Sequence, residues 1–81
     1  MSEKIKLIWD FRGPNAHKTA EHHDLHLKDF LRMNQRLNLT TGVEELGEYH
    51  CIAFLIVEKS DMTFFRDRLK PHRGQVYTPN E

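Results

Sequence analysis

Residues 49–58, YHCIAFLIVE, decide the fold, because this ten-residue segment is apolar on both faces of a strand. Side chains of a strand point alternately to its two sides, so the segment divides into two apolar sets. A strand that is apolar on both sides has to be covered on both, which predicts a central position in a sheet. The two sets are Cys51, Ala53, Leu55 and Val57 on one face, and Ile52, Phe54 and Ile56 on the other.

The longest helical pattern covers residues 15–34 and supplies one of these covers. Asn15 is placed to act as its N-cap, and Gly13-Pro14 separates it from the preceding segment. Charged side chains occupy its far side, so the pattern predicts an amphipathic helix packed on the sheet. The near side is a stripe at three- and four-residue spacing that consists of Ala16, Ala20, His23, Leu27, Phe30 and Leu31.

Three further strands are predicted from alternation and from turn residues. Residues 4–11 alternate with one strongly apolar face, and residues 39–46 read as a polar edge strand in which Gly42 marks a bulge. Residues 75–78 read as a short final edge strand.

A second, short helix is predicted over residues 62–69. Ser60 or Asp61 caps its start, and Phe65 and Leu69 face inward. Basic residues gather around its end, which suits the negative end of a helix dipole. This basic cluster has two interpretations, a solvated helix end or a site for an anion or an acidic partner, and it consists of Arg66, Arg68, Lys70, His72 and Arg73.

The element order is β-α-β-β-α-β over a single domain, residues 1–81. This order predicts an α+β ferredoxin-like sandwich, in which two helices cover one face of a four-stranded antiparallel sheet. The other face is then expected to expose Ile8 with either the Ile52 set or the Cys51 set of the central strand. Because an exposed apolar patch of that size usually marks a partner, we predict a homodimer that forms through the sheet.

Composition excludes several classes of protein. The chain carries twelve basic and twelve acidic residues, so a nucleic-acid partner bound through phosphate contacts is not predicted. No apolar run of about 18 residues is present, so no membrane span is predicted. The N-terminal residues lack the pattern of a signal peptide. Cys51 is the only cysteine, which favours a reducing, cytoplasmic location.

Several short features resemble the dimeric α+β-barrel proteins, in particular the small YCII-like group. These features are His26-Leu27 in the long helix, Gly42 after a turn, an apolar strand from Ile52 to Glu58, and Pro71 to Gly74 as a Pro-x-x-Gly stretch. The resemblance implies a small enzyme or a ligand-binding dimer whose site pairs a helix histidine with an aspartate before the proline. His26 matches the histidine, but Lys70 stands at the aspartate position, which argues against the implied catalytic route.

The histidines of the long helix allow a metal site. His22 and His26 stand four residues apart and can face a common ion such as zinc, which needs three or four ligands. His50 or His72 could complete the set after folding. The HExxH pattern of zinc proteases is absent, and no other cofactor is predicted.

Three residues are candidates for catalysis. His26 lies at the border of the apolar stripe and is the first choice for a general base. His23 lies within the stripe, either as a packing residue at the helix–sheet seam or as a neutral base in a semi-buried cavity. Asp10 either lines a cavity on the dimer-facing side or bonds the turn at Gly13. Cys51 is predicted to be a core residue.

Three functions follow from these residues. The first is a small-ligand-binding or regulatory homodimer, with a pocket between the long helix and the sheet and with His23 and His26 near its mouth. The second is a small cofactor-free enzyme that uses His26 as general base. The third is a metal-binding module built on His22 and His26.

Overall fold

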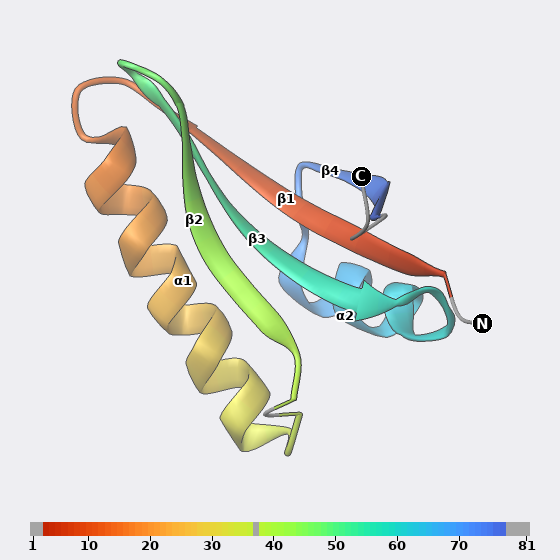
Figure 1. Ribbon diagram of the computed structural model, residues 1–81. Coiled ribbons are helices and arrows are strands. Elements are labelled where there is room, and N and C mark those ends of the chain that lie inside the picture. The colour runs from red at the N-terminus through yellow and green to blue at the C-terminus, as the bar shows by residue number, and fades with distance from the viewer. Residues whose placement is uncertain (1–2, 37, 78–81) are drawn as a thin grey trace.

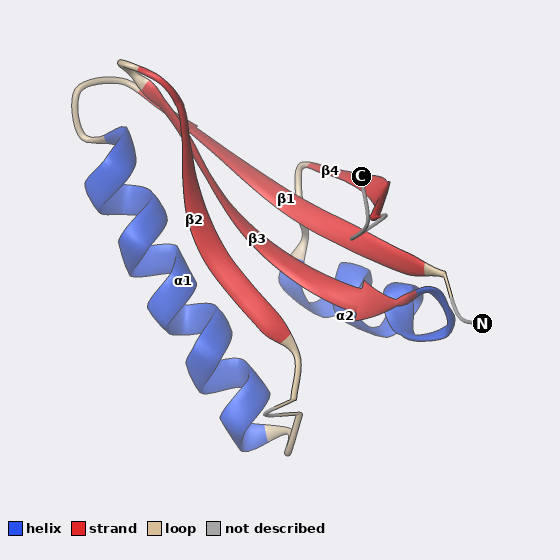
Figure 2. Ribbon diagram, viewed as in Figure 1, coloured by secondary structure: helices blue, strands red, loops and turns tan. Residues whose placement is uncertain are grey.

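The computed structural model describes residues 3–36 and 38–77 and has the predicted element order (Figure 1). It is an α+β ferredoxin-like fold. Thr78, expected in the last strand, lies outside the described residues. The elements, coloured by type in Figure 2, are β1 (Lys4–Arg12), α1 (Ala16–Met33), β2 (Thr40–Gly47), β3 (His50–Glu58), the 3-10 turn η1 (Lys59–Asp61), α2 (Met62–Leu69) and β4 (Arg73–Tyr77).

The four strands form one antiparallel sheet in the order β2-β3-β1-β4. The central position predicted for residues 49–58 is confirmed, since β3 pairs with β1 on one side and with β2 on the other. Helix α1 lies along β3 and β2, whereas α2 is joined to β1 through the Trp9 indole, which donates a hydrogen bond to the Leu69 carbonyl at 3.0 Å (Figure 1). None of the described helices is long and apolar enough to cross a membrane.

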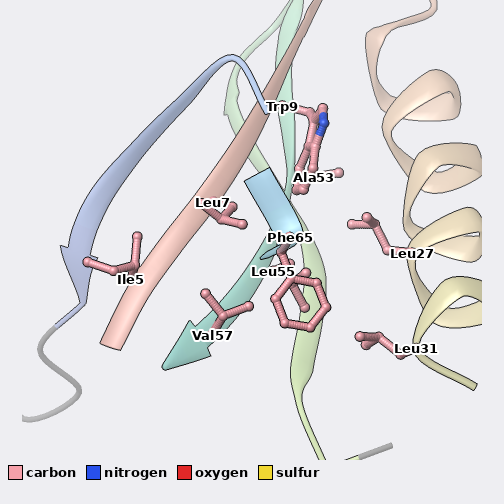
Figure 3. Packing of buried hydrophobic residues seen from close by; sticks show 9 residues of the cluster. All are labelled: Ile5, Leu7, Trp9, Leu27, Leu31, Ala53, Leu55, Val57 and Phe65. Atoms are coloured by element: carbon pink, nitrogen blue, oxygen red, sulfur yellow. The ribbon is translucent and has the colours of Figure 1, made fainter. Parts of the chain in front are cut away.

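The main core lies between the helices and one face of the sheet. Leu27 and Leu31 point from α1 toward the strands, and Phe65 of α2 is fully buried among them (Figure 3). Burying aliphatic and aromatic side chains of this size is the main favourable contribution to the folding free energy. The strand residues of this cluster are Ile5, Leu7, Trp9, Ala53, Leu55 and Val57.

The predicted bulge at Gly42 is wrong. Gly42 pairs regularly with Phe54, and the irregularity of β2 lies between Glu45 and Gly47. Gly42 instead leaves space for the Phe54 ring, because a Cβ at position 42 would stand 2.6 Å from Cζ of Phe54. Glycine in an edge strand therefore makes room for a ring that lies across it.

The predicted side-chain caps are also absent from the structure. Asn15 and Asp61 occupy the N-cap positions of α1 and α2, but neither side chain bonds the first turn of its helix. The carboxylate of Asp61 pairs instead with Arg36 at 3.2 Å. The Asn15 carbonyl accepts the amide and the hydroxyl of Thr19.

The face of the sheet away from the helices, called here the open face, does not expose its apolar residues. Ile8, Ile52 and Ile56 are only 1%, 2% and 8% exposed within a single chain. The expectation that these side chains would lie bare is therefore wrong.

Long polar side chains of the same face explain this burial. Lys6 extends across Phe54, with its ammonium 4.5 Å from the ring centroid, and reaches Glu44 of β2 at 3.1 Å. Arg73 of the edge strand pairs with Asp10 of β1 at 2.9 Å. Such side chains lay apolar stems over apolar neighbours while their charged ends meet each other, a cover that alternation alone does not reveal.

Candidate functional site

A groove of about 430 Å³ runs between α2 and β4 on the helix side of the sheet. Its apolar wall consists of Ile5, Leu7, Met62, Pro71 and Val76. Its polar rim consists of Arg66, His72, Arg73 and Gln75. Gly74 completes the lining.

The sequence of β4 creates this groove. Gly74 and Val76 lie on the helix side of the strand, because they pair with Leu7 and Ile5 of β1. Gly74 contributes no side chain, and Val76 is left 56% exposed. A Cβ at position 74 would meet the Ile5 and Leu7 side chains at 3.6 Å, an ordinary contact distance. The missing side chain therefore leaves a hollow over Ile5 and Leu7, which are themselves only 7% and 2% exposed, and Val76 is its exposed apolar wall.

The charge of the groove is one-sided. Among the described residues that line it, two are arginines and one is a histidine, and none is acidic. The side chain of Arg66 is 54% exposed, and its contact with Asp67 spans 3.5 Å, at the outer limit of a hydrogen bond. The guanidinium of Arg73 is already paired, since it donates two hydrogen bonds to the Asp10 carboxylate. Arg66 is thus the cation with the greater capacity to bind a ligand.

His72, the residue before β4, bonds the start of that strand to β1. Its amide donates to the Ile8 carbonyl at 2.9 Å, and its ring Nδ1 accepts the Asp10 amide at 2.8 Å. The ring nitrogen therefore accepts a hydrogen bond that a backbone carbonyl would accept if β4 were longer. It extends the pairing of β1 with β4 by one hydrogen bond. Because Nδ1 is the acceptor, the proton of the neutral ring resides on Nε2. His72 is exposed and lines the groove, so this N–H group is a hydrogen-bond donor at its rim.

Asp10 is the centre of a charge network on the open face. Its carboxylate accepts two hydrogen bonds from Arg73, at 2.9 and 3.1 Å, and lies 2.8 Å from Nε2 of His50. The hydrogen bonds from Arg73 contribute most to lowering the pKa of Asp10 to about 2, with a smaller contribution from His50, and burial opposes them. The predicted bond to the Gly13 turn is wrong, because the Gly13 amide donates to the Tyr49 carbonyl.

His23 packs at the seam between α1 and the sheet. Its ring lies 4.8 Å from that of Trp9 and 5.6 Å from that of Phe11, as the packing interpretation predicts. Burial lowers its pKa, and His26 and His72 add to this lowering. The Nε2 atom is buried and has no hydrogen-bond partner among residues 3–36 and 38–77. Asp10 and His23 are not brought together, since they lie on opposite faces of the sheet.

His26 lies on the exposed side of α1, with its ring edge-on to His22 at 5.9 Å between centroids. The two distant candidates for a metal site lie elsewhere, because His50 contacts Asp10 on the open face and His72 contacts the Asp10 amide. The described part of the chain contains no group of three or more potential metal ligands. His22 and His26 alone fall short of the ligand number that zinc requires.

The sequence interpretation missed two features. Asp24 is 8% exposed, with one carboxylate oxygen 3.0 Å from Lys28 and the other without a described partner. Its spacing from Ala20 and Leu27, four and three residues, would have placed it on the buried stripe. The groove was missed because it arises from a residue without a side chain, Gly74, where β4 lies beside β1, a strand far from it in sequence.

Comparison of the chain with protein-family models, with curated proteins and with solved structures found no match.

Proposed function

We propose that this protein binds a small apolar molecule in the groove between α2 and β4. The single observation that carries the proposal is the apolar lining of this hollow, with Ile5 and Leu7 beneath Gly74 and with Met62 and the exposed Val76 as its walls. Small-molecule sites in proteins are apolar hollows of roughly 300–1,000 Å³ with a few polar groups at defined positions. The groove has that volume and that kind of lining.

The ligand-binding function is the one that we predicted from the sequence. The proposed site differs, because it lies between α2 and β4 and not between α1 and the sheet. His23 and His26 do not line the groove, whereas His72 does. The enzyme based on His26 and the metal module on His22 and His26 remain predictions without a supporting contact.

The homodimer also remains a prediction, and the groove does not depend on it. Its original basis was an apolar open face, and Ile8 and Ile52 of that face are buried within one chain. Sedimentation equilibrium over a range of micromolar concentrations measures the mass directly. A mass of one chain throughout would remove the dimer from the proposal and leave the groove in place.

The test uses a neutral apolar probe, 1-octanol, followed by ¹H–¹⁵N NMR. We expect saturable shifts of the amides of Gly74 and Val76, with smaller shifts along α1. Replacement of Gly74 by Leu places a side chain on the floor of the groove and should abolish these shifts. The matched control is Thr40→Leu, which adds a similar side chain to the open face of the other edge strand, β2, at a residue that does not line the groove.

Two results would refute the proposal. One is the absence of saturable shifts in the wild-type protein up to the solubility limit of octanol. The other is equal octanol binding by the Gly74→Leu and Thr40→Leu variants, with both shown by their NMR spectra to be folded.

A further inference from the structure

We infer that the natural ligand of this groove is an amphipathic acid, with an apolar body on the floor and a carboxylate held at the rim by Arg66 and His72. This inference rests on the proposed function, and it adds the chemical class of the ligand.

The charge of the lining favours an anion over a cation. Arg66 and His72 lie at the rim, the charge of Arg73 is balanced by Asp10, and the described lining contains no carboxylate. The neighbouring carboxylate of Asp10 is already saturated by two hydrogen bonds from Arg73, and it lies on the opposite face of the sheet. An ammonium group placed in the groove would meet the guanidinium of Arg66 and no carboxylate of the described lining. A carboxylate would meet a guanidinium, whose planar donors match its two oxygens.

The hydrogen-bond state of His72 favours the same ligand. Since Nδ1 accepts the Asp10 amide at 2.8 Å, the neutral ring offers only a donor, Nε2–H, to anything in the groove. A ligand oxygen that accepts hydrogen bonds is therefore the complementary group. This preference follows from the hydrogen bond to the Asp10 amide and not from a charge on His72.

The apolar wall limits the charge of the ligand. Five of the lining side chains are aliphatic, thioether or proline, so most of the ligand surface is expected to be apolar. A multiply charged phosphate ester would bury charge against this wall without enough donors, at a high desolvation cost. A single carboxylate at one end can stay at the solvent-exposed rim, where Arg66 is 54% exposed.

The test compares three probes of equal chain length: octanoate, 1-octanol and octylammonium, at pH 7.5 and low salt. We expect octanoate to bind about five- to tenfold more tightly than octanol, a ratio typical of one charge-assisted contact at a partly exposed site. Octylammonium should bind more weakly than octanol. Added salt should reduce the advantage of octanoate and leave octanol binding unchanged.

A pair of variants assigns the effect to one side chain. Arg66→Gln should bring octanoate affinity down to that of octanol. Arg68→Gln is the control, because it removes the same charge from α2 at a side chain that stacks on Phe64, with its guanidinium carbon 4.0 Å from the ring centroid. It should keep the full preference for octanoate.

The outcomes separate this inference from the proposed function. Equal affinity for octanoate and octanol, or an equal loss in both arginine variants, overturns the assignment of an acid and leaves the apolar groove standing. Failure of all three probes to bind overturns the groove itself, and the inference with it.

Discussion

The ring of Phe54 occupies the space next to Gly42 that a β-carbon would fill, with Cζ only 2.6 Å from that position. The same ring lies under the ammonium of Lys6, 4.5 Å from the ring centroid, and Lys6 in turn pairs with Glu44. One glycine on an edge strand thus allows an aromatic ring and an ion pair to cover the centre of the open face. The burial of Ile8 and Ile52 within a single chain follows from this arrangement.

Replacement of Gly42 by Ala should destabilise the protein by about 1–2 kcal/mol, because the Phe54 ring has to move away from its position under Lys6. The measurement is the free energy of unfolding in urea. Gly47→Ala is the control, since a Cβ at position 47 meets no atom within 4 Å. Equal stability of the two variants would contradict the packing described for Phe54.

Asp10 should stabilise the fold at neutral pH and lose this effect in acid. Its pKa is lowered from 3.8 to about 2, so the unfolded chain takes up the proton first as the pH falls. The stabilisation is complete above about pH 4 and is lost between about pH 4 and pH 2. Asp10→Asn should therefore cost about 1 kcal/mol of unfolding free energy at pH 7 and little at pH 2.

The control for Asp10 is Asp29→Asn, which removes an exposed i,i+3 pair with Arg32. It should change the unfolding free energy by less than about 0.5 kcal/mol at either pH. A loss in Asp10→Asn that is the same at pH 7 and pH 2 would show that the Arg73 and His50 contacts do not depend on the carboxylate charge.

His23 should make the protein less stable as the pH falls below about 6.5. Burial between Trp9 and Phe11 lowers its pKa in the folded state, so the unfolded chain binds the proton more readily. His23→Gln should flatten the slope of unfolding free energy against pH between pH 7 and pH 5. An unchanged slope in His23→Gln would contradict the burial of this ring between Trp9 and Phe11.

Lys70 ends α2 in the left-handed region, with φ of 52°. Glycine adopts this conformation without the steric cost of a side chain. We expect Lys70→Gly to raise the unfolding free energy by about 0.5–1 kcal/mol. A lower stability, measured by urea unfolding, would show that the Lys70 side chain contributes contacts that outweigh the backbone strain.

The fold was predictable because its periodicities are strong. The alternation of residues 49–58 fixed the central strand, and the stripe from Ala16 to Leu31 fixed the face of α1 that packs on the sheet. The cover of the open face was not predictable, because it depends on diagonal contacts such as Lys6 to Glu44, between strands distant in sequence. Alternation assigns these side chains to a face but does not show that they lie flat on it.

The candidate site was harder to predict than the fold. The sequence directed attention to the histidines of α1, yet His22 and His26 are exposed and His23 is packed against aromatic rings. The basic residues around the end of α2 include Arg66, His72 and Arg73, which line the proposed groove. Their significance depends on Gly74, and the effect of a missing side chain becomes visible only when β4 is placed beside β1.

The most direct test of the groove is the set of intermolecular NOEs between bound octanoate and the methyl groups of the protein. Placement of the ligand between α2 and β4 predicts NOEs from the terminal methyl of octanoate to Leu7, Met62 and Val76, which line the groove. NOEs to Leu31 or other side chains of α1 in their place would contradict it.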